Sequence, residues 1–104
     1  MNARADDGST PLMYASGFNS NPEVLIVLIK AGANVNARDD NGKTALMYAA
    51  RYNSNSEVLS DLINAGADAR AKDIDGKTAF DYAKDNKIIK GTKQYWELND
   101  ARYK

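Results

Sequence analysis

Histidine and cysteine are both missing from this sequence of 104 residues. Without cysteine the chain forms no disulfides, and without either residue type it lacks the common zinc ligands and the usual catalytic thiols and imidazole bases. A histidine-based pH switch is excluded for the same reason. Nothing else in the sequence points to catalysis, and we expect a chain that is not an enzyme, holds no metal or cofactor and has no small-molecule substrate.

An excess of charge of one sign is also lacking, because 14 Lys and Arg balance 14 Asp and Glu. A protein with zero net charge has no broad field that attracts nucleic acid or a membrane surface. The longest apolar run, Val24 to Ile29, is far shorter than the roughly 20 residues of a membrane span. No basic-then-apolar leader begins the sequence. We therefore expect a chain that binds neither membrane nor nucleic acid. The sequence leaves the compartment open and favours the cytoplasm.

One pattern recurs along the chain with a period of 34 residues. The later part of the unit recurs in Glu23-Val24-Leu25 and Glu57-Val58-Leu59. One such unit cannot bury its apolar face alone, so the period predicts a stack of similar units. Turn glycines, threonines and tyrosines mark the same places in each unit: Gly8, Gly42 and Gly76; Thr10, Thr44 and Thr78; Tyr14, Tyr48 and Tyr82.

Within each unit the residues predict a turn, a helix, a second turn and a second helix. Thr10 followed by Pro11 is typical of a helix start, since threonine accepts an unpaired N–H and proline has none to leave unused. We expect this first helix to reach about Phe18, and its copy to reach about Tyr52. The expected helix-ending residues are Asn19 and Asn53 for the first helices, in a left-handed conformation, and Gly32 and Gly66 for the second helices.

The unit resembles the ankyrin repeat, whose signature is Thr-Pro-Leu-His-x-Ala after a turn and a Gly-Ala-Asp element after the second helix. The matching residues here are Thr10-Pro11-Leu12-Met13-Tyr14-Ala15 and Gly66-Ala67-Asp68. The resemblance implies an all-α solenoid of stacked helix-turn-helix units joined by β-turn connections. It divides a single domain, residues 1–104, into repeats at about 5–38 and 39–72 and a C-terminal repeat or cap at about 73–104.

The sequence departs from the ankyrin pattern at one position of each unit. Met13, Met47 and Asp81 stand where the family has histidine. We therefore expect the hydrogen bond from that histidine to the nearby threonine to be lost. The connection between the helices is also one residue longer than the family's, which accounts for the period of 34. We expect both changes to lower stability without altering the fold.

The C-terminal segment differs from the units before it and carries an aromatic cluster. Thr92 is expected to cap a last helix, and two isoleucines are expected to fill the space before it. We interpret the aromatic residues as a lid over the core rather than as a ligand site. They are Tyr95, Trp96 and Tyr103, beside Leu98, and the isoleucines are Ile88 and Ile89.

Three motifs that are typical of other functions lack essential residues. Gly42-Lys43-Thr44 matches the end of a phosphate-binding loop, but the glycine needed five residues earlier is Ala37. Asp73-x-Asp75-Gly76 resembles the middle of a calcium loop, but the bidentate glutamate is replaced by Tyr82. The carboxylate pair Asp39-Asp40 has no neighbouring base or nucleophile, so we interpret it as solvated turn charge.

The C-terminal third of the chain is mildly basic. From Arg70 onward there are nine Lys and Arg against six Asp and Glu. Together with Tyr95 and Trp96, this charge is compatible with a contact to nucleic acid. Scattered surface lysines explain the same composition, and we favour that interpretation.

The ankyrin resemblance implies a binding module that presents turn tips and one helix face to a partner protein. Large amphipathic side chains dominate such sites, so Phe18, Arg51 and Tyr52 are predicted as binding hot spots. The positions that the resemblance places on the groove are Arg4, Asp6, Asp7, Ser9 and Phe18 in the first repeat, Arg38, Asp40, Asn41, Lys43, Arg51 and Tyr52 in the second, and Lys72, Ile74, Asp75, Lys77 and Asn86 in the third.

The alternative function is self-association through the first repeat. Ile26 and Val27 stand where the second repeat has Ser60 and Asp61, which makes the first repeat the more apolar one. Two interpretations follow from the sequence. Either a neighbouring repeat of a longer array covers this face, or two copies of the chain meet there as a homodimer.

Overall fold

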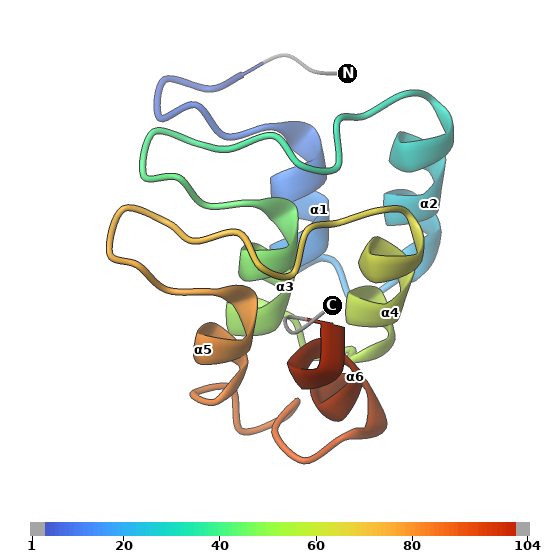
Figure 1. Cartoon of the computed structure of the whole chain (residues 1–104). Helices are drawn as coiled ribbons and strands as arrows, with labels where there is room; N and C mark the ends of the chain where they lie inside the picture. Colours follow the sequence, from blue (N-terminus) through green and yellow to red (C-terminus); the bar gives the residue numbers. More distant parts are fainter. Residues whose placement is uncertain (1–3, 102–104) are drawn as a thin grey trace.

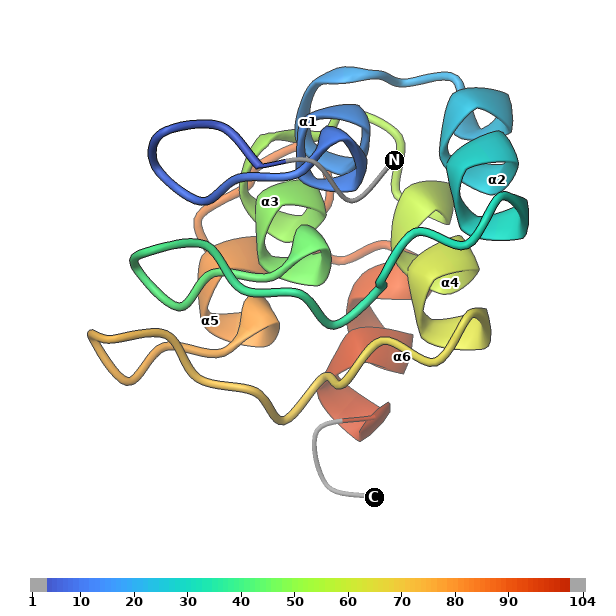
Figure 2. The same cartoon turned by 90° about the horizontal axis from the view of Figure 1, so that it is seen from above.

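The computed structural model describes residues 4–101, which form six helices in three successive pairs. Helices α1, α3 and α5 stack in one row and α2, α4 and α6 in a second row (Figure 1). The turns that precede the first helix of each pair project to the same side (Figure 2). No strand occurs within residues 4–101, and the expected all-α class is confirmed. The pairs are α1 (Pro11–Phe18) with α2 (Pro22–Lys30), α3 (Ala45–Tyr52) with α4 (Glu57–Asn64), and α5 (Ala79–Ala83) with α6 (Lys93–Ala101).

The first helix of each pair begins at a threonine that accepts a hydrogen bond from the helix backbone. Oγ1 of Thr10 accepts from the N–H of Met13 at 3.3 Å, and Oγ1 of Thr44 accepts from the N–H of Met47 at 3.4 Å. Pro11 is the first residue of α1, a position whose N–H has no acceptor within the helix, so the missing N–H of proline costs no hydrogen bond. The helix start expected at Thr10 and Pro11 is therefore confirmed.

The asparagines that follow α1 and α3 adopt extended conformations, so the left-handed stop expected for them is wrong. Asn19 has a φ of −110° and Asn53 a φ of −76°. Their Oδ1 atoms accept from the N–H groups of Asn21 and Asn55, at 2.9 and 2.8 Å, which closes the turn without a positive φ. Gly32, with a φ of 100°, does end α2 in the left-handed region, as expected.

Small residues on the first helices allow successive helix pairs to pack closely. Ala49 and Ala50 of α3, which packs between α1 and α5, are completely buried. Gly17 of α1 faces α3, and a Cβ atom at Gly17 would lie 3.3 Å from the Cβ of Tyr48. The second row is filled by larger side chains such as Leu62 of α4, which is also completely buried. The core therefore runs continuously along the stack.

A buried asparagine connects each later helix pair to the one before it. Nδ2 of Asn53 donates to the carbonyls of Ser16, at 2.7 Å, and Asn19, at 3.0 Å. Nδ2 of Asn86 donates to the carbonyls of Ala50 and Asn53, both at 3.0 Å. Asn86 is only 8% exposed. Its amide is used inside the stack and does not face a partner, contrary to the sequence prediction.

Two arginines connect the successive turns. The guanidinium of Arg4 donates to the carbonyl of Arg38 at 2.6 Å, and the guanidinium of Arg38 donates to the carbonyl of Lys72 at 2.8 Å. A backbone bond from the N–H of Asp40 to the carbonyl of Asp7, at 2.9 Å, runs parallel to them. Each turn is therefore held by the next one along the stack.

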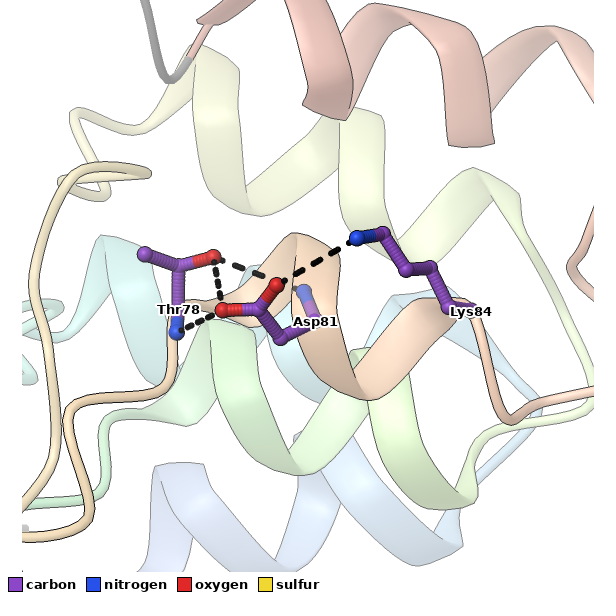
Figure 3. Close-up of polar contacts among 3 residues, drawn as sticks. All are labelled: Thr78, Asp81 and Lys84. Carbon is purple, nitrogen blue, oxygen red and sulfur yellow. Dashed lines mark hydrogen bonds and ion pairs between the residues drawn. The ribbon is translucent and has the colours of Figure 1, made fainter.

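A carboxylate in the third helix pair makes the bond that was expected to be lost with the histidine of the ankyrin pattern. Oδ2 of Asp81 accepts from the N–H of Thr78 at 2.9 Å and from its hydroxyl at 3.2 Å, while Nζ of Lys84 lies 3.6 Å from Oδ1 (Figure 3). The backbone bond from Thr78 is the main reason that the pKa of Asp81 is lowered, against the effect of burial. The expected loss is therefore wrong for α5. In α1 the N–H of Thr10 lies 3.4 Å from the sulfur of Met13, a weaker acceptor.

The C-terminal helix closes the end of the stack. Thr92 accepts from the N–H of Tyr95 at 3.1 Å, as expected, and the ring of Tyr95 packs on Phe80 with centroids 4.9 Å apart. Ile89 is completely buried, but Ile88 is 65% exposed, so only one of the two isoleucines fills the core. Tyr95 and Leu98 are buried and belong to the lid, whereas Trp96 is exposed; Tyr103 lies outside the described residues.

We predict that Asn53→Ala lowers the free energy of unfolding by about 1–3 kcal/mol, because it leaves two carbonyls in the stack without their donor. Asn19→Ala is the matched control. It removes the equivalent turn bond, from the N–H two residues later, but α1 has no preceding helix pair among the described residues. Urea unfolding followed by circular dichroism measures both variants. Equal losses in the two variants would contradict the role assigned to the inter-repeat bonds.

Candidate functional site

Two buried carboxylates fix the turns to the helices that follow them. Oδ2 of Asp39 accepts from the hydroxyl of Tyr48 at 2.5 Å, and its Oδ1 accepts from the N–H groups of Asn41 and Lys43, both at 2.9 Å. Asp73 repeats this arrangement with the hydroxyl of Tyr82 and the turn backbone. Asp39 is only 7% exposed. The sequence interpretation was right about its turn role and wrong in treating it as solvated.

Burial and these hydrogen bonds shift the pKa values of Asp73 and of the two tyrosines. Burial disfavours ionisation of Asp73, but bonds from the Tyr82 hydroxyl and from two backbone N–H groups, with the nearby Lys43, hold its pKa below 3.8. Burial and the adjacent carboxylate raise the pKa values of the Tyr48 and Tyr82 hydroxyls well above 10. The tyrosines therefore remain neutral donors over the physiological range.

The first turn lacks the buried carboxylate. Ala5 occupies the position of Asp39, and Oδ1 of Asp7 instead accepts from the N–H and hydroxyl of Ser9, at 3.0 and 2.6 Å. The Ser9 hydroxyl is the main cause of the lowered pKa of Asp7. Ser9 itself is 4% exposed, so it supports the turn and is not available to a partner, contrary to the sequence prediction. Tyr14, with no carboxylate at the matching position, is 56% exposed.

Aromatic side chains form a row across the first helices. The rings of Tyr14 and Phe18 are 6.0 Å apart on α1, and those of Tyr48 and Tyr52 are 6.3 Å apart on α3. Residues four apart lie on the same helix face, which explains both pairs. Phe18 stacks on Tyr52 across the two helices with centroids 5.1 Å apart. We call these four residues, together with Tyr82 of α5, the aromatic row.

Cations border the aromatic row at its C-terminal end. The guanidinium carbon of Arg51 lies 5.3 Å from the ring centre of Tyr52 and 5.5 Å from that of Tyr82. Nζ of Lys43 and Nζ of Lys77 lie 5.7 and 5.6 Å from the centre of Tyr82. These distances are in the range of cation–π contacts, which hold long side chains over a ring. An aromatic face and a cationic face therefore meet on one side of the stack.

The structure brings together five of the predicted groove residues: Phe18, Arg51, Tyr52, Lys43 and Lys77. It places another group, exposed, on or beside the turns: Asp6, Asp7, Asp40, Asn41, Lys72, Ile74 and Asp75. The remaining predicted residues serve the stack itself: Arg4 and Arg38 between turns, and Ser9 and Asn86 in buried positions.

Sequence reasoning missed Tyr14 and Tyr48 as residues of this surface, and it missed Tyr82 as the buried ring, 4% exposed, over which the cations lie. The three tyrosines recur every 34 residues and served only to identify the repeat. The signal that could have found them is the second aromatic residue four positions later, Phe18 after Tyr14 and Tyr52 after Tyr48. Two such pairs at equivalent repeat positions predict neighbouring aromatic pairs on stacked helices.

A family model described as ankyrin repeats, in three copies, matches residues 1–73. This match covers more than half of the chain, and the chain belongs to the ankyrin repeat family. Ankyrin repeats are generally protein-interaction modules and are typically not enzymes. A search of curated proteins finds no match to the chain. Within residues 4–101, none of the helices is both long and apolar enough to cross a membrane.

We predict that Asp73→Asn lowers the free energy of unfolding at pH 7 by about 1 kcal/mol, since it weakens charge-assisted hydrogen bonds. The folded pKa of Asp73 is lower than its unfolded value, so the unfolded state binds the proton first. Ionised Asp73 therefore makes its full contribution to the free energy of unfolding above about pH 4, and this contribution is lost as the pH falls through the folded pKa.

Urea unfolding between pH 7 and pH 2.5 measures this dependence. The difference between wild type and Asp73→Asn should shrink as the pH falls below 4. Asp75→Asn, at the exposed tip of the same turn, is the control and should leave the pH dependence unchanged. A difference that stays constant down to pH 2.5 would contradict the assignment.

Proposed function

We propose that the chain binds a partner protein through the face formed by the aromatic row and its bordering cations. The exposure of the row carries this proposal: Phe18 is 62% exposed, Tyr14 56% and Tyr52 45%, although each ring touches another. Folded proteins seldom leave several contacting aromatic rings in water, and such patches mark contact sites.

The energetics of binding interfaces favour these residues as anchors. Tyrosine, tryptophan and arginine are enriched among the residues whose truncation costs most affinity. Here the ring of Tyr52 is held between Phe18 and Arg51, so little side-chain freedom is left to lose on binding. Rigid stacking of α1 on α3 presents the anchors at a fixed spacing.

The exposed turn residues form the second part of the proposed surface. Buried carboxylates fix the second and third turns, the bonds between Asp7 and Ser9 fix the first, and backbone bonds connect the turns. The residues at the surface differ from turn to turn: Asp6 and Asp7, then Asp40, Asn41 and Lys43, then Ile74, Asp75 and Lys77. We assign α5 and α6, which follow the matched residues, to a C-terminal repeat that completes this surface and caps the stack.

We predict that the double variant Arg51→Ala/Tyr52→Ala weakens partner binding at least about tenfold without unfolding the chain. A random library of 12-residue peptides displayed on phage supplies ligands, and fluorescence polarisation with synthetic copies measures affinity. Both residues are exposed, so the urea midpoint should move little. Selected peptides that bind the double variant as tightly as wild type would contradict the proposed site.

A second candidate function, self-association, is supported by the apolar face of α2. A hollow of about 310 Å³ there is lined by Asn21, Glu23, Val24, Val27 and Leu28. The equivalent positions of the next repeat, on α4, are much less exposed than those on α2. Val58 and Leu62, at the positions of Val24 and Leu28 in the next repeat, are completely buried, whereas Val24 is 41% and Val27 64% exposed.

The self-association face differs from the one expected from the sequence. Ile26 was grouped with Val27, but Ile26 is 36% exposed, and its counterpart Ser60 donates to Glu97 of α6 at 2.8 Å. That position therefore points toward the following helix pair. Val27 is the exposed centre of the stripe, with Glu23 one turn before it and Lys30 one turn after it. An antiparallel pairing of two α2 helices brings each glutamate near a lysine of the other copy.

If two copies associate in this way, the mass measured by light scattering after size exclusion should rise toward a dimer between micromolar and millimolar concentration. Val27→Lys should abolish the rise, because it places two like charges at the centre of the contact. Ile26→Ser, which copies Ser60, is the control and should leave the rise in place. A constant mass near 11.4 kDa over the whole range would contradict self-association.

A further inference from the structure

Three cations surround the ring of Tyr82, and none of them has an ion-pair partner within residues 4–101. Lys43, Arg51 and Lys77 each lie 5.5 to 5.7 Å from its centre, and they come from two turns and one helix. Within residues 4–101 the one ion pair with an N···O distance below 4.0 Å is between Lys84 and Asp81, on another part of α5. We call the three side chains the cation trio.

The two carboxylates that hydrogen-bond Tyr48 and Tyr82 are already occupied. Asp39 and Asp73 are each 7% exposed and accept hydrogen bonds from a tyrosine hydroxyl and from the turn backbone. Lys43 influences Asp73 only through space, as a minor cause of its lowered pKa. Within residues 4–101, the side-chain N–H groups of the trio therefore have no acceptor and are left for a ligand.

The aromatic row runs directly into the cation trio. Arg51 touches the rings of both Tyr52 and Tyr82, and Tyr52 stacks on Phe18. A ligand that covers this surface meets an apolar face at one end and three cations at the other. That combination suits a segment with a large apolar side chain beside one or more carboxylates.

We infer that the partner docks an acidic segment of its chain here, with a carboxylate on the cation trio and an aromatic or large aliphatic side chain on Phe18 and Tyr52. This inference rests on the proposed binding function and specifies the chemistry of the partner. The guanidinium of an arginine donates two parallel hydrogen bonds to a carboxylate, and the two lysines add positive charge without requiring one geometry. Complementary charge at such a border accelerates association and selects the partner.

Single-stranded nucleic acid also combines stacking with negative charge, but the turns disfavour it. A nucleic acid carries a charge at every phosphate along its length. Asp6, Asp7, Asp40 and Asp75 are exposed on the same turns and would repel such a backbone. A peptide can place its carboxylates only where the cations lie. The chain as a whole has no net charge to attract a polyanion.

The test uses the peptides selected on phage by the intact chain. Selected sequences should be net negative and should carry a large apolar residue close to an aspartate or glutamate. The double variant Lys43→Gln/Lys77→Gln should weaken their binding at least about tenfold, and raising the salt concentration should weaken binding to wild type but much less to this variant. Lys87→Gln/Lys90→Gln removes two exposed charges away from the row and is the matched control.

The outcomes separate this inference from the proposed function. Neutral or basic peptides that lose affinity in Phe18→Ala/Tyr52→Ala but not in Lys43→Gln/Lys77→Gln would overturn the acidic partner and leave the binding face intact. Peptides unaffected by Phe18→Ala/Tyr52→Ala, or a library that yields no ligand, would overturn both. Tighter binding of a fluorescent 12-nucleotide DNA strand than of any selected peptide would overturn the inference in favour of nucleic acid.

Discussion

The architecture depends on one constraint, which is that each helix pair buries its inner face only against the neighbouring pair. Close approach of the first helices requires small residues such as Gly17 and Ala49, and it brings backbone carbonyls into positions that water does not reach. The side chains of Asn53 and Asn86 satisfy those carbonyls. Repetition of this arrangement fixes the relative positions of the side chains that the first helices carry on their outer side, including those of the face proposed for binding.

The same constraint produces the surface proposed for binding. Each of α1 and α3 carries a pair of aromatic residues four positions apart on one face. Because the two helices are stacked in register, the two pairs lie side by side. The turns are fixed independently, through the bonds between Asp39 and Tyr48 and between Asp73 and Tyr82. These tyrosines serve both purposes, since their hydroxyls hold the turns while their rings form part of the row. The face is therefore built from structural residues and exposed ones together.

Much of the fold could be predicted from the sequence, because the 34-residue period carries the turn glycines, the helix caps and the apolar stripes in one register. Functions of single polar residues were harder to predict. Whether Asn86 faces a partner or a carbonyl depends on the helix pair before it, which a local pattern does not contain. The bond to the threonine was expected to be lost with the family's histidine, but the carboxylate of Asp81 makes it, and the family pattern does not specify a carboxylate there. The hot spots Phe18 and Tyr52 were chosen by residue type, and their stacking on each other is a result of tertiary packing.

The central claim is that the aromatic row and its cations are the surface that binds a partner. Heteronuclear NMR of the isotope-labelled chain, titrated with a peptide selected by wild type, tests this claim most directly. If the partner binds there, the largest chemical-shift changes fall on Phe18, Arg51, Tyr52 and the turns that carry Lys43 and Lys77. Changes concentrated on α2 or α6, with the aromatic row unaffected, would contradict it.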